Sequence, residues 1–406
     1  MTLFYVLIGI LLFDFVFERI LSLYNKRHLQ KGIPEELDTK INEQEFNDTI
    51  AYKTVNYKFG LLTALFSFAL IMLMLFLNGF AYIDEIAKEL SSNNIIIAMI
   101  FFGILFFASD LINLPFSVYD TFIIEKRFGF NKSTPKLFIS DKLKGWLLAI
   151  IIGGILLSVI IFIYNATREY FWILSWGVIV LFSVFMNVFY TTLILPLFNK
   201  LSPLEDGELK TSILRMCEKT GFTLDNVYII DGSKRSTKAN AYFSGLGKRK
   251  KIVLYDTLLN DLYTEEIVAV LNHEIGHFKK KHIIKGLVSS FLQTGITLYL
   301  FSIFVDNDLF AQALGAEKAS FHLGVITFGI LYHPISLVTG IMFNYFSRKN
   351  EFEADAFAKK FGGGEALISA LLKLTKKNLS DINPHPFYVF VNYSHPTLIQ
   401  RIKFLK

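Results

Sequence analysis

Cysteine is nearly absent from this 406-residue chain. Cys217 is its only cysteine. A single thiol cannot form an internal disulfide bond, so the sequence does not indicate a disulfide-stabilised extracellular domain. A nucleophilic cysteine would need a partner histidine, and none is apparent near Cys217. We therefore predict that Cys217 is a structural residue.

Charged residues are also scarce. They make up 19% of the chain, against about a quarter in typical soluble domains, and 53% of the residues are hydrophobic. The apolar residues form long runs that alternate with charged stretches, which is typical of a polytopic membrane protein. The net charge of +6 comes largely from loops, and no nucleic-acid-binding motif occurs, so we expect no nucleic-acid partner.

Seven runs are long and apolar enough to cross a membrane. Their approximate limits are 3–23, 60–82, 95–116, 145–165, 171–195, 285–304 and 321–346. The first run differs from a signal peptide because it lacks a basic start and a small-residue cleavage site. Asp14, Glu18 and Arg19 also interrupt it. We therefore expect the first run to be a retained helix.

Basic residues are concentrated on one side of these predicted spans. The loops 24–59 and 117–144 carry six Lys or Arg residues each, whereas the loops on the other side carry one each. The positive-inside rule then places the N-terminus outside and the C-terminus in the cytoplasm. The membrane is a bacterial inner membrane or the endoplasmic reticulum, depending on the source organism.

The predicted cytoplasmic loop 199–284 has the pattern of a small folded domain. Val227–Ile230 and Lys251–Tyr255 are short β-rich runs, and residues 240–243 between them resemble an edge strand. The expected fold is an all-α polytopic membrane protein with seven transmembrane helices and a small α+β cytoplasmic domain. Its expected parts are 1–198 with five spans, 199–284, 285–346 with two spans, and the cytoplasmic segment 347–406.

A helix is predicted from Thr264, a candidate N-cap, and it carries the sequence His273-Glu274-Ile275-Gly276-His277. Residues four apart share a helical face, so His273 and His277 can reach one metal ion. Glu274 is one position along, where its carboxylate can hold a water at an open metal position. This is the H-E-x-x-H pattern of zinc hydrolases. The alternative is a set of ordinary polar residues on an exposed helix face.

A second group of candidate ligands follows the seventh predicted span. Glu351 and Asp355 are four apart on a predicted helix, so one carboxylate can bind the metal while the other steadies a ligating histidine. Glu353 points elsewhere on that helix and is expected to be a solvated charge. Spans six and seven form a hairpin, which returns the chain to the side that it left. Glu351 can therefore meet the H-E-x-x-H helix.

The sequence resembles the type I CAAX prenyl proteases, which are seven-span membrane zinc endopeptidases of the gluzincin type. The resemblance covers nearly the whole chain. It rests on six segments in the same order, namely DTFIIEKRFGFN at 120–131, GSKRS at 232–236, NAYF at 240–243, LNHEIGH at 271–277, EFEADAFA at 351–358 and YSHP at 393–396.

The resemblance implies a membrane endopeptidase with one zinc ion per chain, whose spans enclose a large water-filled chamber. It implies that His273, His277 and Glu351 bind the zinc ion and that Glu274 is the general base. Asp355 would support a zinc ligand, and His395 would stabilise the oxyanion with Arg401 as a nearby cation. Asn240, Ala241 and Tyr242 would pair with the substrate backbone. An edge strand has unpaired backbone groups that suit the last of these roles.

Several of these residues carry little signal by themselves. From the residues alone, His395 would be a surface or capping histidine, and Arg401 could be a solvated residue on a terminal helix. His282 and His385 lack ligand spacing and are expected to be structural.

Polar residues in the predicted spans have other roles. His322 and His333 lie in or near span seven, and His333 precedes Pro334, where it is expected to satisfy backbone groups freed at a kink. Asp110 and Asn113 close the third span and suit either a chamber or a helix end at the interface.

The implied substrate is a peptide or protein with a prenylated C-terminal motif, and membrane lipid is the other expected partner. The oligomeric state is not encoded. Two alternatives are a membrane quality-control zinc protease of broader specificity and a transporter with a structural metal site. Glu274 argues against the transporter, because a purely structural site has no use for a carboxylate beside an open metal position.

Overall fold

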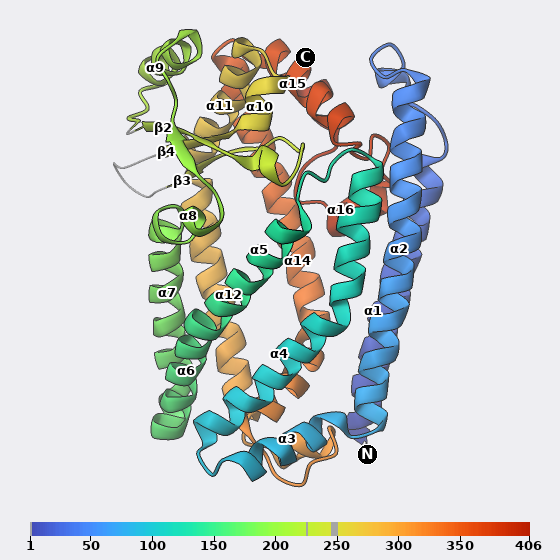
Figure 1. Ribbon diagram of the computed structural model, residues 1–406, viewed down its shortest axis with the longest axis vertical. Helices are drawn as coiled ribbons and strands as arrows, with labels where there is room; N and C mark the ends of the chain where they lie inside the picture. The colour runs from blue at the N-terminus through green and yellow to red at the C-terminus, as the bar shows by residue number, and fades with distance from the viewer. Residues whose placement is uncertain (1, 225, 245–250) are drawn as a thin grey trace.

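The computed structural model describes residues 2–224, 226–244 and 251–406. It is mostly helical, with one small sheet at the end of the molecule that also holds the C-terminus, and the N-terminus lies at the opposite end (Figure 1). The elements before the sheet domain are α1 (Thr2–Leu29), α2 (Glu43–Phe76), α3 (Gly79–Leu90), α4 (Asn94–Tyr119), α5 (Pro135–Leu148), α6 (Gly154–Thr167), α7 (Phe171–Leu193) and α8 (Leu195–Phe198).

Five helical stretches among the described residues are long and apolar enough to cross a membrane, namely Glu43–Phe76, Asn94–Glu125, Pro135–Phe198, His282–Phe304 and Phe321–Lys360. The 64-residue stretch Pro135–Phe198 reverses direction at Arg168, whose φ is 34°, so that α6 packs against α7. Between 6% and 17% of the most apolar windows of these stretches is buried, so few of their side chains are fully enclosed by protein.

Local sequence explains where these helices begin. At the start of α2, the Asn42 side chain accepts a hydrogen bond from the Glu45 amide at 2.9 Å. The Glu45 carboxylate accepts one in return from the Asn42 amide at 3.0 Å. This reciprocal cap satisfies two amides that the first turn leaves without helical partners. Thr134 caps α5 in a similar way, and Pro135 takes the first helical position.

Polar side chains within the helical stretches pair between helices. Asp110 of α4 accepts hydrogen bonds from Lys142 at 2.7 Å and Trp146 at 2.9 Å, both on α5. Asn113 instead donates to the Ser109 carbonyl within its own helix. Asp110 therefore connects two helices, a role that the sequence left undecided.

Two histidines of α14 (Phe321–Lys360) also pair with carboxylates. The ring of His333 lies 2.6 Å from Asp14 of α1, so the expectation that it satisfies backbone groups beside Pro334 was wrong. His322 is buried and lies 2.6 Å from Asp84 of α3. Both pairs hold α14 against other helices.

The second half of the chain forms the sheet and the helices around it. The sheet has the order β1-β2-β4-β3, in which β2 and β4 are parallel and the two outer pairs are antiparallel. Its elements are β1 (Leu201–Pro203), β2 (Asn226–Ile230), β3 (Ala241–Ser244) and β4 (Lys251–Tyr255), and the helices are α9 (Glu208–Thr220), α10 (Asp256–Asp261), α11 (Thr264–Lys279), α12 (His282–Phe304), α13 (Asp308–Gln312), α14, α15 (Gly364–Lys377), α16 (Pro386–Asn392) and α17 (Leu398–Leu405).

The three predicted β-rich runs are confirmed as β2, β3 and β4, and β3 is at an edge of the described sheet. The strand β1 was not predicted. The N-cap of α11 is Tyr263 rather than Thr264, since the amide of Tyr263 donates to the Glu266 carboxylate at 2.8 Å.

The core of this domain lies between the sheet, α9 and α11. Ile252 and Leu254 of β4 and Leu271 and Ile275 of α11 are fully buried in it. Cys217 of α9 belongs to the same core, and burial raises the pKa of its thiol to about 11. The prediction that Cys217 is a structural residue is therefore confirmed. The burial of Leu271 and Ile275 fixes the rotation of α11 and leaves its other face free for the site.

Candidate active site

The site lies where α11 crosses α14. Gly276 permits this crossing, because a Cβ atom at its position would lie 2.9 Å from the Ala354 Cα atom and 3.1 Å from its carbonyl oxygen. These distances are below ordinary carbon contacts of about 3.5 Å or more. The two helices therefore approach more closely at Gly276 than any larger residue would allow, and this brings His273 and His277 beside Glu351.

His273, His277 and Glu351 form a compact set of three candidate ligand side chains, with one ligand atom from each within 4.8 Å of the others. The two Nε2 atoms are 3.2 Å apart, and Oε2 of Glu351 lies 3.4 Å from His273 Nε2 while its Oε1 lies 3.3 Å from His277 Nε2. Ligands about 2.0–2.1 Å from a tetrahedral zinc ion lie roughly 3.3 Å from one another. Oε2 of Glu351 is also buried without a hydrogen-bond partner among the described residues. The arrangement fits a metal ion bound by three protein ligands.

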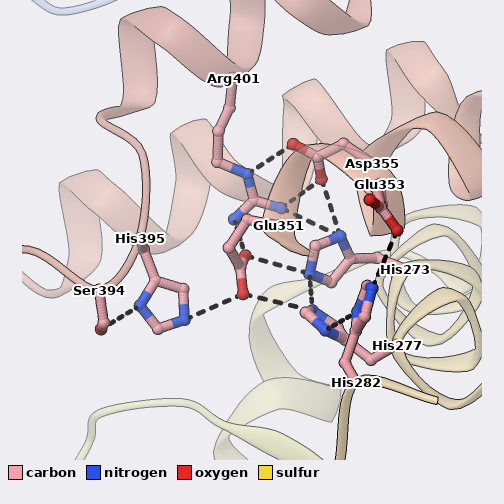
Figure 2. A network of polar contacts seen from close by, with 9 residues as sticks. All are labelled: His273, His277, His282, Glu351, Glu353, Asp355, Ser394, His395 and Arg401. Carbon is pink, nitrogen blue, oxygen red and sulfur yellow. Dashed lines mark hydrogen bonds and ion pairs between the residues drawn. The ribbon is translucent and has the colours of Figure 1, made fainter. Parts of the chain in front are cut away.

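The Asp355 carboxylate contacts the ring nitrogen of His273 that is not in the ligand set. Nδ1 of His273 is 2.7 Å from Asp355 Oδ1, and the Arg401 guanidinium donates to both oxygens of Asp355 at 2.6 and 2.9 Å (Figure 2). Arg401 Nη2 also lies 3.3 Å from His273 Nδ1. Both of these nitrogens carry hydrogens when Nδ1 donates to Asp355, so Arg401 acts on the imidazole through the carboxylate. The hydrogen bond to Asp355 leaves Nε2 of His273 free to bind metal.

His277 has a different partner. Its Nδ1 is 3.0 Å from Nδ1 of His282, and Nε2 of His282 is 3.2 Å from the Glu353 carboxylate (Figure 2). The expectation that Glu353 is a solvated charge was therefore wrong, because it is paired with a buried histidine. Sequence spacing gave no sign of either contact.

Glu274 and His395 are the remaining candidate catalytic side chains. Glu274 is partly buried next to the candidate ligand His273, and this burial raises the pKa of its carboxyl. His395 comes from the segment before α17, and its Nε2 is 3.4 Å from a Glu351 oxygen. Its side chain is 64% exposed, so the imidazole lies at the open side of the ligand set. His385, by contrast, caps α16 through its ring nitrogen, as a structural residue would.

Asn240, Ala241 and Tyr242 lie at the start of the edge strand β3. This strand pairs with β4 on one side, where Ala241 lies opposite Leu254, and it packs against α11 and α7. The Asn240 side chain accepts a hydrogen bond from the Ala241 amide at 2.8 Å. The strand therefore lies beside the helix that carries His273 and His277.

Two neighbouring motifs hold β3 in place. Arg235 forms two hydrogen bonds to Asp141 of α5, at 2.7 and 2.8 Å, and Lys238 lies 2.7 Å from Glu125. An isolated bridge joins Asn131 to Ser236. The segments 120–131 and 232–243, which are far apart in the sequence, are thus connected immediately before the edge strand.

Known proteins place this site in a family. Residues 203–406 match the family described as "Peptidase family M48", and residues 23–200 match "CAAX prenyl protease N-terminal, five membrane helices". The chain belongs to the CAAX prenyl protease family. As a member of this family it is an integral membrane metalloprotease, which confirms the expected enzyme class, and the M48 family implies a metal ion.

Relatives of this family match almost the whole chain. The "CAAX prenyl protease 1" of Saccharomyces cerevisiae is 34% identical over 97% of this chain and 93% of its own. The "CAAX prenyl protease 1 homolog" of Dictyostelium discoideum is 36% identical over 91% of this chain and 88% of its own. The crystal structure of S. mikatae Ste24p superimposes with a TM-score of 0.95 at 33% identity, covering 100% of this chain and 99% of that one.

Proposed function

We propose that this CAAX prenyl protease uses one zinc ion per chain to hydrolyse peptide bonds near the C-terminus of prenylated CAAX-type proteins. The observation that carries the proposal is the ligand set of His273, His277 and Glu351, whose nearest nitrogen and oxygen atoms lie 3.2–3.4 Å apart and suit a zinc ion with an open fourth position. The names of the relatives supply the substrate class.

A zinc ion held by His273, His277 and Glu351 would supply Lewis acidity for activating water and polarising the scissile carbonyl. Glu274 follows His273 on α11 and is the general base, which accepts the proton of the attacking water and passes it to the leaving amine. Burial of the side chain raises the pKa of its carboxyl.

His395 is the proposed donor to the developing oxyanion. Nδ1 of His395 lies 2.9 Å from the Ser394 hydroxyl, which can donate to it and so place the ring proton on Nε2. Nε2 is the atom that faces Glu351 at the open side of the ligand set. Asp355 orients His273, and Arg401 holds Asp355. Asn240, Ala241 and Tyr242 pair with the extended substrate, because the outer edge of β3 has no partner strand within the described sheet.

We further propose seven spans around a water-filled chamber. The reversal at Arg168 divides Pro135–Phe198 into two spans, and α1, with 28 residues, is long enough to be another. The small buried share of the spans suits helices that face lipid on one side and water on the other. The N-terminus is then outside the cytoplasm. The segment 199–284 follows the five spans of 1–198, and the segment 347–406 follows the two spans of 285–346. These two segments together form the cytoplasmic catalytic region.

Purified Glu274→Gln protein tests the mechanism. It should retain zinc and lose hydrolysis by several orders of magnitude, while Glu265→Gln, an exposed carboxylate on the same helix, should behave as wild type. Undiminished cleavage by the Glu274 variant would contradict the assignment.

Three substrates test the specificity, namely a prenylated CAAX peptide, the same peptide without the prenyl group, and a misfolded membrane protein. Preferential cleavage of the prenylated peptide supports the proposal. Cleavage of the misfolded protein alone would identify a quality-control protease, and zinc binding without any hydrolysis would favour a structural metal site.

A further inference from the structure

The two zinc-binding histidines are supported in different ways. His273 donates directly to the buried carboxylate Asp355 at 2.7 Å, which Arg401 holds by two hydrogen bonds. His277 contacts a second imidazole, that of His282, and a carboxylate follows only behind it. We propose that His282 and Glu353 are positioning residues, which orient His277 for metal binding. The inference rests on the proposed zinc site.

The direction of the hydrogen bonds follows from metal binding. An imidazole that binds a metal through Nε2 carries its proton on Nδ1, so His277 Nδ1 donates to His282 Nδ1. That nitrogen of His282 must then be unprotonated, which places the proton of His282 on Nε2. Nε2 of His282 lies 3.2 Å from Glu353 Oε2, which accepts this proton. Each donor in the chain His277, His282, Glu353 thus has one acceptor.

The backbone brings His282 to this place. Helix α11 ends at Lys279, and Lys281 adopts a left-handed conformation with φ of 58° before α12 starts at His282. In a continuous helix, residues five apart would point about 140° away from each other. The break at Lys281 instead turns the His282 ring back to that of His277, with ring centroids 5.1 Å apart.

Burial shows that the contact is not a chance surface pair. The side chain of His282 is 4% exposed, and that of Glu353 is 33% exposed. A buried imidazole between two hydrogen-bond partners has a fixed orientation, and it therefore fixes the ring of His277. Since His282 comes from the start of α12, the arrangement also ties a spanning helix to the metal site.

The experiment measures zinc affinity of the full-length protein by competition with a chelator, which does not depend on catalysis. His282→Ala should weaken zinc binding about 10- to 100-fold. His282→Asn retains an acceptor near the position of Nδ1 and should recover most of that affinity. Glu353→Ala should lose less than His282→Ala, and the double alanine variant should bind zinc no more weakly than His282→Ala, because both residues act through one contact.

His322→Ala is the matched control. His322 is also a buried histidine paired with a carboxylate, but it lies 29 residues before Glu351 on α14, which is about 43 Å along the helix. This variant should have a lower melting temperature and wild-type zinc affinity.

Three results would overturn the proposal. They are wild-type zinc affinity in His282→Ala, no recovery of zinc affinity in His282→Asn, or a loss of zinc affinity in the double variant equal to the product of the single losses. If His282→Ala does not fold, the zinc affinities of His282→Asn and Glu353→Ala are compared with that of the wild-type protein to test the proposal. Failure of the wild-type protein to bind zinc would refute the proposed function itself.

Discussion

Replacing Gly276 with alanine would place a methyl group in the contact between α11 and α14. The new Cβ atom would lie 2.9 Å from the Ala354 Cα atom and 3.0 Å from the Phe357 Cβ atom. Carbon atoms prefer separations of about 3.5 Å or more, so the helices must separate by roughly 0.6 Å. Because the obstacle includes backbone atoms, a side-chain rotation cannot relieve it.

This displacement acts directly on the ligand set. His277 follows Gly276 on α11, and Glu351 lies one turn before Ala354 on α14, so both ligands move with their helices. Zinc sites tolerate changes in ligand distance of about 0.2 Å, which is smaller than the expected shift. We expect zinc affinity to fall by about 10- to 100-fold, as with other disturbed zinc sites. Overpacking should also destabilise the fold by about 1–3 kcal/mol.

Zinc competition and thermal unfolding of the purified protein measure the two effects. Gly286→Ala on α12 is the control, because a methyl group there would have no atom within 4 Å and alanine favours a helix over glycine by about 0.5–1 kcal/mol. If Gly276→Ala matched the wild-type protein in both zinc affinity and melting temperature, the close crossing would not be what sets the ligand distances.

Three further predictions concern residues around the site. Arg401→Lys should lower zinc affinity and melting temperature nearly as much as Arg401→Ala, because one ammonium cannot reproduce the two hydrogen bonds to Asp355, and a lysine variant equal to wild type would contradict this. The thiol of Cys217, with its pKa of about 11, should resist maleimide in the folded protein and react after denaturation, as mass spectrometry can detect. Arg235→Ala should lower kcat/KM by loosening the segment before β3 while leaving zinc content unchanged, and loss of zinc would instead indicate a wider disturbance.

The parts of the site that follow helical periodicity could be predicted from the sequence. His273 and His277 share a face because they are four residues apart, and Glu351 and Asp355 do so for the same reason. The hairpin of two spans then accounts for their meeting. His282 and Glu353 could not be predicted in this way, because their contact depends on the left-handed residue Lys281 and on the depth of the helix crossing.

The fold also has some elements that the sequence predicts and others that it does not. The strands β2 and β4 have enough β-branched and aromatic residues to be recognised, whereas β1 has three residues and forms only because β2 offers it an edge. The pairs Asp14–His333 and Asp110–Lys142 each join residues that are distant in the sequence. No local pattern links such residues, so their partners emerge only from tertiary packing.

The length of α14 has a consequence for how this protein can vary. It runs without a break through 40 residues and carries His322 near its first turn and Glu351 and Asp355 near its last. Inserting one residue between them would rotate every later side chain by about 100° and advance it by about 1.5 Å. Glu351 would then leave the face that meets α11, while His322 stayed with Asp84. Insertions and deletions should therefore be excluded from the interior of α14, whatever residues are inserted.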